Sequence, residues 1–126
     1  MSDNFKPASA DKSESNIQII QIQGYQVLVL SGDIDVYSAP QLKQSIISIL
    51  DEDTQHLIID MHNVIYIDSC VITTLISAVK RVKSKGGTLN LVGCSSRIEH
   101  VLCITKVSAF MTLHANVEDA IEALSA

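Results

Sequence analysis

The sequence is poor in aromatic residues, with no Trp, two Phe and three Tyr among 126 residues. Its core must therefore be built from Ile, Leu, Val and Ala, a mixture that is common where helices cover a parallel or mixed sheet. Only five Gly and two Pro, with an apolar share of 47%, exclude a fibrous or disordered chain. The length suits one domain, so we expect a single α/β domain.

Positive charge is also scarce, because nine Lys and Arg face fourteen Asp and Glu and give a formal net charge of −5. A nucleic-acid partner is disfavoured, since binding phosphates requires a basic surface. No apolar run reaches the roughly 18 residues of a spanning helix, and the N-terminus lacks the basic-then-apolar pattern of a signal peptide. We expect a cytoplasmic protein that binds neither nucleic acid nor membrane.

Neither the cysteines nor any known catalytic motif indicates a disulfide framework, a zinc site or an enzyme. Cys70, Cys94 and Cys103 are odd in number and form neither a CxxC pair nor a dense disulfide pattern, so we expect buried reduced thiols. The motifs GxSxG, Walker A, GxGxxG and HExxH are absent. His62, two residues after Asp60, could suggest a metal pair, although a polar loop contact is the simpler interpretation. We expect no enzyme, no cofactor and no metal site.

The pattern of apolar residues predicts the order of the elements. Residues 1–15 are too polar to bury much surface, so we expect a flexible tail before a domain over 16–126. Alternating and β-rich runs predict strands, and apolar stripes behind capping residues predict helices. The predicted strands cover 17–22, 25–30, 56–61, 88–92 and 110–113, and the predicted helices begin at Ser38, Asp68, Ser95 or Ser96, and Asn116. This order predicts a mixed sheet of four to five strands packed by about four helices.

The start of the longest predicted helix is the most plausible functional position. Helix N-termini at the carboxyl ends of strands present unpaired N–H groups and partial positive charge. After a short turn that follows the strand beginning near His56, we expect Asp68 to cap the helix and Ser69 to expose its hydroxyl at the tip. Free backbone donors there could hold a phosphate on Ser69. Asp-Ser can also simply start a helix, and these two residues alone do not decide between the two interpretations.

Residues 32–42 read Gly-Asp-Ile-Asp-Val-Tyr-Ser-Ala-Pro-Gln-Leu, and residues 60–70 read Asp-Met-His-Asn-Val-Ile-Tyr-Ile-Asp-Ser-Cys. Together these two segments resemble the signature of bacterial anti-sigma factor antagonists, which are STAS domains. The first is similar to the segment that opens the family's first helix, and the second is similar to the segment in which the Ser after Asp is phosphorylated. The two motifs keep the family's order and spacing, and the resemblance spans roughly residues 16–124, so it implies the STAS fold.

The resemblance also implies a mechanism and its residues. In the family, the unphosphorylated domain binds an anti-sigma factor that is itself an ATP-dependent serine kinase, and the sigma factor is released. Phosphorylation breaks this binding, and a PP2C-type phosphatase restores it. By matching positions, Ser69 is the phospho-acceptor, Asp68 shapes the acceptor turn, and Asp35 helps engage the kinase. The implied partner-binding residues are Asp35, Tyr37, Asp68, Ser69 and Cys70.

The sequence departs from the family where Cys70 and Val71 replace the usual Ser or Thr and Gly. Val71 either packs inward or changes how closely a kinase can approach. A similar loss of the glycine occurs in scaffold members of stress-sensing complexes, so a non-catalytic STAS scaffold is a second interpretation. An accessory STAS subunit of an ABC transporter is a third. The basic end of the long helix could meet an acidic partner, although a solvated end is simpler; it comprises Lys80, Arg81, Lys83 and Lys85.

Overall fold

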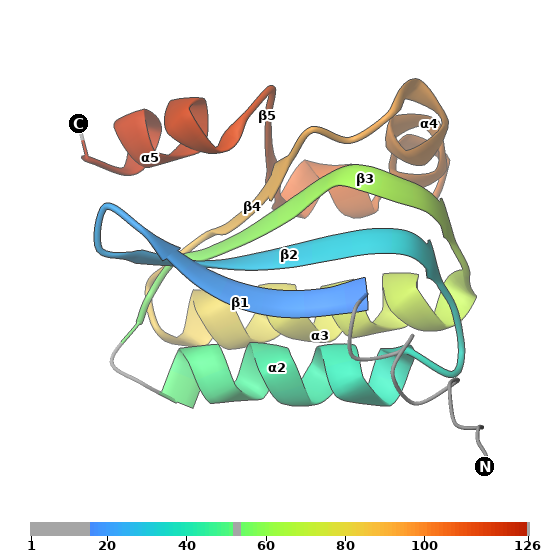
Figure 1. The fold of residues 1–126 in the computed structure, drawn as a ribbon, viewed down its shortest axis with the longest axis horizontal. Coiled ribbons are helices and arrows are strands. Elements are labelled where there is room, and N and C mark those ends of the chain that lie inside the picture. Colours follow the sequence, from blue (N-terminus) through green and yellow to red (C-terminus); the bar gives the residue numbers. More distant parts are fainter. Residues whose placement is uncertain (1–15, 52–53, 126) are drawn as a thin grey trace, which may run out of the picture.

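Five strands form one mixed sheet in the order β1-β2-β3-β4-β5 (Figure 1). The computed structural model describes residues 16–51 and 54–125, so the expectation of a tail over 1–15 lies outside the described residues. The strands are β1 (Ile17–Ile22), β2 (Tyr25–Ile34), β3 (Leu57–Ile67), β4 (Leu89–Val92) and β5 (Thr112–His114). β1 pairs antiparallel with β2, and each later neighbouring pair is parallel.

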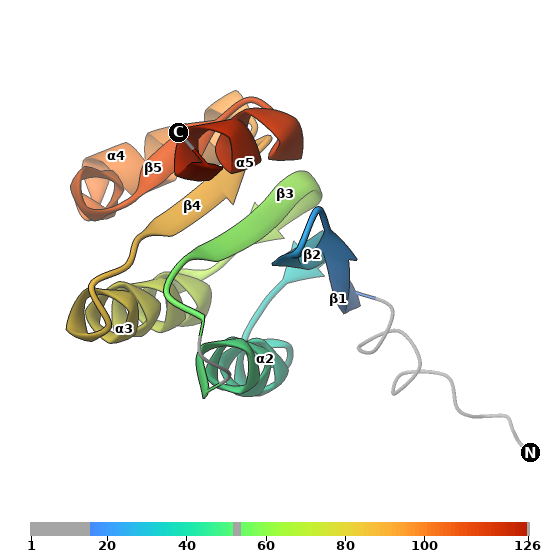
Figure 2. The same cartoon turned by 90° about the vertical axis from the view of Figure 1, so that its left-hand side faces the viewer.

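A helix follows each strand from β2 to β5, and those before β5 connect the parallel strands, as parallel pairing requires. They are α2 (Ala39–Asp51), α3 (Ser69–Ser84), α4 (Ser96–Ile104), the 3₁₀ helix η1 (Val107–Phe110) and α5 (Val117–Ser125). Figure 2 shows α2 and α3 side by side on one face of the sheet, with α5 on the opposite face. The mixed α/β architecture predicted from the sequence is confirmed.

Two apolar cores hold these layers together. The larger core lies between the sheet and α2 and α3, and includes Leu28, Ile59 and Leu75. The smaller core lies under α5, where Val27 and Ile58 meet Ile121. Because helices cover β3 on both faces, all five residues from Leu57 to Met61 are buried, and this first part of the strand is an apolar run interrupted only by Asp60.

The two central strands are longer than the sequence predicted. The expected turn after Met61 is wrong, because β3 continues to Ile67 and β2 continues beside it to Ile34. The pair stays in contact through shifts of register, one of them between Gly32 and Asp33. Gly32 has φ +74°, a conformation that glycine adopts without the steric cost of a side chain. This irregularity carries both strands to the end of the sheet where the two sequence motifs meet.

The helix starts agree closely with the predicted caps, whereas the bounds of the last strand differ from the prediction. Ser95 caps α4 by accepting from Ile98 N at 3.3 Å, and Asn116 Oδ1 accepts from Asp119 N at 2.8 Å at the start of α5. The strand expected over 110–113 is wrong in its bounds. Residues 107–110 form η1 instead, and β5 begins at Thr112.

The basic end of α3 is only partly solvated. Lys85 donates to the backbone oxygen of Leu50 at the end of α2. Lys83 places its Nζ 4.7 Å from the centre of the Phe110 ring, a cation–π geometry. Lys83 and Lys85 therefore contact neighbouring elements, although Lys83 is exposed, as are Lys80 and Arg81.

The three cysteines carry free thiols, but the expectation that they are buried is wrong. Cys70 and Cys94 are half-buried, and Cys103 is exposed on α4. Burial, with a smaller effect of the Glu99 carboxylate, raises the pKa of the Cys94 thiol to about 11. Among the described helices, none is long and apolar enough to cross a membrane.

Candidate functional site

The two sequence motifs meet at one end of the sheet. Ile34 and Ile67, the last residues of β2 and β3, are paired in register. The loops that follow them therefore lie side by side, and each leads into a helix, α2 or α3 (Figure 1). Both helices direct the positive ends of their dipoles towards this end of the sheet.

Asp68 organises the start of α3. Its backbone is extended, with φ −110° and ψ −176°, and its Oδ1 accepts from Cys70 N at 3.0 Å and from Val71 N at 3.2 Å. Ser69 is the first helical residue and is exposed. The predicted N-cap and the predicted exposure of Ser69 are both confirmed.

The expectation of free backbone donors at this tip is only partly right. The N–H groups of Cys70 and Val71 already donate to Asp68. A phosphate on Ser69 would thus meet the helix dipole and water beside the Asp68 carboxylate, rather than an open nest of N–H groups.

Val71, the second of the two departures from the family pattern, packs inward. Its side chain is fully buried in the larger core. It therefore does not project into the surface around Ser69. That surface continues instead along the outward face of α3, where the exposed Thr73 donates its hydroxyl to the backbone oxygen of Ser69 at 3.0 Å.

Asp35 orders the neighbouring loop between β2 and α2. Its Oδ1 accepts from Tyr37 N at 3.0 Å and from Ser38 N at 3.3 Å, a turn typical of aspartate. The backbone oxygen of Ser38 accepts from Leu42 N, so Ser38 takes the predicted place before the helix. Tyr37 is 84% exposed and Asp35 is half-buried. Asp35 therefore holds the loop that presents Tyr37 to solvent.

A groove of about 600 Å³ between α2 and α3 extends this surface. The sequence predicted one of its residues, Cys70, and missed the rest. The lining residues are Val36, Ala39, Pro40, Lys43, Gln44, Cys70, Thr73 and Thr74. The sequence did contain a signal for the lining residues on α3. Thr73 and Thr74 follow Cys70 by three and four positions, so they share its face of the helix, away from the buried Leu75.

Two apolar side chains on β3 add to the same end of the sheet. Ile65 is 68% exposed and Tyr66 is 49% exposed, and Tyr66 pairs in register with Asp33 on β2. Neither residue was predicted as part of the site, because the strand was expected to end at Met61 and not at Ile67. Exposed large apolar side chains near a candidate site are a feature of surfaces that bind proteins.

Asp60 and His62 form a local contact. His62 Nδ1 lies 2.6 Å from Asp60 Oδ1, and His62 N donates to the same oxygen at 3.1 Å. Asp60 is nearly buried, whereas the His62 side chain is 57% exposed. In the described part of the chain, no three His, Cys, Asp or Glu side chains gather as a metal site. Asp60 and His62 thus make the expected polar contact, but both lie within β3 and not in a loop.

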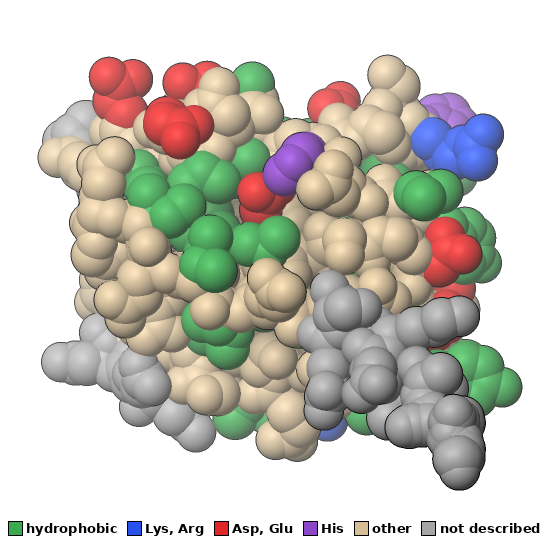
Figure 3. All heavy atoms as spheres, in the orientation of Figure 1, with side chains coloured by type: hydrophobic (Ala, Val, Ile, Leu, Met, Phe, Trp, Pro, Cys, Tyr) green, Lys and Arg blue, Asp and Glu red, His purple; other side chains and the backbone are tan. Residues whose placement is uncertain are grey.

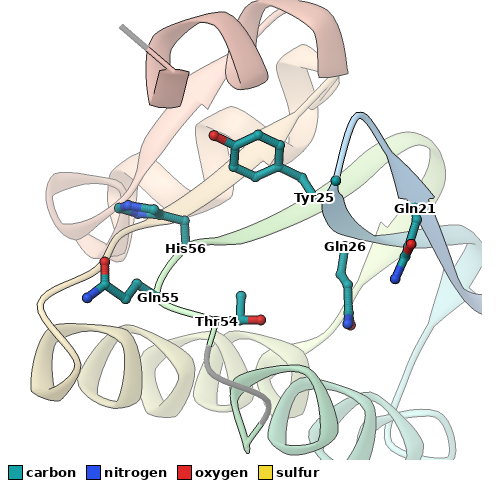
Figure 4. Close-up of a pocket in the computed structure, with 7 residues that line it drawn as sticks. Gln21, Tyr25, Gln26, Thr54, Gln55 and His56 are labelled. Carbon is teal, nitrogen blue, oxygen red and sulfur yellow. The ribbon is translucent and has the colours of Figure 1, made fainter.

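A second hollow, of about 430 Å³, lies near the β1–β2 turn and the start of β3. Figure 4 shows Gln21, Tyr25 and Gln26 from the hairpin on one side, and Thr54, Gln55 and His56 on the other. Two of the rings are engaged within the protein, His56 Nδ1 with Thr88 Oγ1 at 2.9 Å and the Tyr25 hydroxyl with Ser125 Oγ at 3.3 Å. The lining residues carry neither a carboxylate nor a Lys or Arg, so this hollow offers less chemistry than the end with Ser69.

Comparison with known proteins agrees with the motifs and the fold. A family model described as the STAS domain matches residues 16–120. The chain is 28% identical over 107 residues to the anti-sigma-B factor antagonist of Bacillus subtilis (strain 168), covering 85% of this chain and 97% of that protein.

Solved structures share the architecture. An anti-sigma factor antagonist from Mycobacterium paratuberculosis matches with a TM-score of 0.78 at 22% identity, covering 87% of this chain and 93% of that one. The Bacillus cell fate determinant SpoIIAA in its phosphorylated form matches with a TM-score of 0.70 at 17% identity, covering 86% and 98%. At these identities the likeness concerns the fold.

Proposed function

The chain belongs to the STAS domain family, and from this premise we propose that it is an anti-sigma factor antagonist whose partner binding is controlled at Ser69. The observation that carries the proposal is the position of Ser69. It is an exposed first residue of α3, directly behind a capping Asp68 and beside the Asp35 loop, in the two segments that resemble the family's motifs. The similarity to an anti-sigma-B factor antagonist over most of both chains supports the same function.

In this proposal the unphosphorylated chain binds an anti-sigma factor serine kinase and displaces the sigma factor. The partner contacts Tyr37, Ser69 and Cys70, together with the groove between α2 and α3. The exposed apolar surface of this end favours binding of a protein rather than a small polar ligand. The chain itself acts without catalysis, because its role is to occupy the kinase.

Phosphorylation of Ser69 would act as a local switch. It adds nearly two negative charges at a helix tip where Asp68 is already negative and its neighbouring N–H groups are taken. The fold keeps its own contacts, since Ser69 is exposed. A partner that covers this tip would have to bury the charge, so binding is lost without unfolding, and a PP2C-type phosphatase would restore it.

A non-catalytic STAS scaffold remains the second candidate. The observation in its favour is that Cys70 and Val71 stand where the family usually has Ser or Thr and Gly. Val71 is buried and leaves the approach to Ser69 open, which favours the phosphoswitch. A pull-down separates the candidates, because the prey would be an anti-sigma kinase, other STAS proteins or an ABC-transporter subunit.

Binding of two Ser69 variants to the kinase encoded nearest to this gene tests the proposal. Ser69→Ala should bind as the wild type does, and Ser69→Asp should bind about tenfold or more weakly, since the partner must bury an unpaired carboxylate. Ser77→Asp is the matched control, because it adds the same charge at another exposed position of α3. Equal binding by the two Ser69 variants would contradict the switch and favour the scaffold.

A further inference from the structure

Within residues 16–51 and 54–125, no strand lies on the outer edge of β1. β1 is the first strand in the sheet order, and among the described strands only β2 pairs with it. Its six residues, Ile-Gln-Ile-Ile-Gln-Ile, include no charge and no proline. Natural sheets usually protect such edges with charged residues, proline, a bulge or a short strand, because the unpaired N–H and C=O groups can accept another strand.

The side chains of this edge are also apolar. Ile19 is 43% exposed on the face that carries α2, and Ile20 is 40% exposed on the opposite face. On that opposite face Ile22 and Tyr25 are half-buried beside it. Figure 3 looks onto the face of the molecule that carries β1 and shows hydrophobic side chains gathered near its centre. Both surfaces of the edge would therefore gain burial from a neighbouring strand.

The hairpin register tells which peptide groups point outward. Gln23 and Gly24, with φ 53° and 86°, form a two-residue turn between the paired residues Ile22 and Tyr25. In such a hairpin the flanking pair exchanges hydrogen bonds, and the pattern alternates along the ladder. Ile20 and Gln18 thus bond to β2, whereas the N–H and C=O groups of Ile19 and Gln21 point away from the sheet.

From these observations we propose that β1 pairs with β1 of a second copy of this chain, forming a symmetric dimer with a continuous ten-stranded sheet. The pairing is antiparallel and centred on Ile19, so that Ile19 meets the same residue of the partner and Gln21 meets the partner's Ile17. Such a contact uses one surface twice and closes on itself. β5, at the other edge, has only three residues, so the sheet does not extend further.

The second copy fits the geometry of the molecule. In Figure 2 the α2 and α5 layers lie over the inner strands, and β1 stands at the outer side of the sheet. None of the described elements therefore stands in the way of a partner strand in the plane of the sheet. Because the pairing is antiparallel, the two Ser69 sites lie at opposite ends of the dimer, and each remains free to bind its own partner.

Sedimentation analysis of the full-length chain over a range of concentrations tests this dimer. We expect the wild type to show twice the chain mass and Ile19→Lys to show the mass of one chain, about a twofold drop, since two lysines would meet at the centre of the interface. Ile104→Lys is the matched control, because Ile104 is an equally large exposed residue on α4 and should leave the dimer intact. Dimers of Ile19→Lys, or a wild type that stays monomeric at its highest soluble concentration, would overturn the proposal.

A second variant keeps the test independent of folding defects. Gln21→Pro removes an N–H group that points outward, so it should leave the hairpin folded by circular dichroism while abolishing the dimer. Hydrogen exchange at Ile19 and Gln21 should also slow as concentration rises. A wild-type monomer that becomes a dimer only after deletion of residues 1–15 would contradict the proposal, because the chain's own N-terminal segment would then occupy the edge. None of these results depends on phosphorylation of Ser69, so failure of the two proposals is distinguishable.

Discussion

At the scale of single residues, Asp68 has two roles that mutation can separate. Its carboxylate caps α3 through the N–H groups of Cys70 and Val71, and its charge lies next to the Ser69 hydroxyl. The cap contributes to stability, whereas the charge acts on whatever approaches Ser69. A substitution of Asp68 that keeps the cap but removes the charge therefore separates the effect on stability from the effect on binding.

Replacement of Asp68 by Ala should lower the free energy of unfolding by about 1 kcal/mol, the usual effect of losing an N-cap. Replacement by Asn should cost much less, because an amide oxygen caps a helix about as well as a carboxylate. Urea denaturation followed by circular dichroism measures both. Equal losses for the two variants would show that the charge, and not the cap, stabilises the start of α3.

The three thiols should differ in reactivity. The raised pKa of Cys94, about 11, keeps its thiol protonated, and its Sγ lies 4.0 Å from Met61 Sδ. Cys103 is exposed. At pH 8 a disulfide reagent should therefore modify Cys103 before Cys94, since the thiolate is the nucleophile. Faster modification of Cys94, identified by peptide mass, would contradict this order.

The raised pKa of Cys94 also predicts how the stability of the fold changes with pH. A thiol whose pKa is raised in the folded state favours folding below its unfolded pKa, and this contribution is lost as the pH rises towards 11. Stability should thus fall more between pH 9 and pH 11 in the wild type than in Cys94→Ala. Parallel profiles of the two proteins in thermal denaturation would contradict the assignment to Cys94.

At the scale of elements, the end of α3 depends on a close approach of two loops. A Cβ on Gly87 would lie 1.7 Å from the backbone oxygen of Gln55, so no side chain fits there without moving the segment before β3. Gly86 lies in open space and has φ +75°. The two neighbouring glycines are therefore needed for different reasons. Gly87 is needed because no side chain fits there, and Gly86 because its backbone has a positive φ.

Gly87→Ala should lower the free energy of unfolding by about 2–3 kcal/mol, because the backbone must shift to relieve the contact. Gly86→Ala should cost about 1 kcal/mol, the strain of a positive φ. Chemical denaturation of both variants checks the order of the effects. A larger loss for Gly86→Ala would mean that the approach of Gln55 to Gly87 is easily relaxed.

The groove between α2 and α3 can be tested without disturbing the core. Thr73→Lys places a long charged side chain at the exposed lining of the groove and should weaken kinase binding about tenfold with little change in stability. Thr105→Lys, at the exposed end of α4, is the control and should bind normally. Calorimetric titration of the kinase measures both. Unchanged binding by Thr73→Lys would place the partner outside the groove.

At the scale of the whole molecule, much of the fold could be predicted from local chemistry. Three helix starts could be predicted from the residue type of the cap alone, and the structure has helices at all three: behind Asp68, Ser95 and Asn116. The lengths of β2 and β3 could not be predicted, because the irregular pairing at Gly32 arises only when the two strands lie together. Ile65 and Tyr66 were missed for that reason.

The site shows the same division between local and long-range information. The sequence placed Ser69 at a capped helix tip, since the cap is a contact within four residues. It missed Val36, Pro40 and Lys43 beside Cys70, because they approach α3 only when α2 packs against it. It also overestimated the free donors at the tip, since the capping Asp68 accepts from the N–H groups of Cys70 and Val71 that were expected to be free for a phosphate.

The proposed function depends on phosphorylation of Ser69. This can be measured as the intact mass of the full-length protein after incubation with ATP and the kinase encoded nearest to its gene, with Ser69→Ala treated in parallel. We expect a gain of one phosphate, mapped by peptide fragmentation to Ser69 and absent from Ser69→Ala. An unchanged wild-type mass while the kinase remains bound, or a phosphate mapped to another residue, would contradict it.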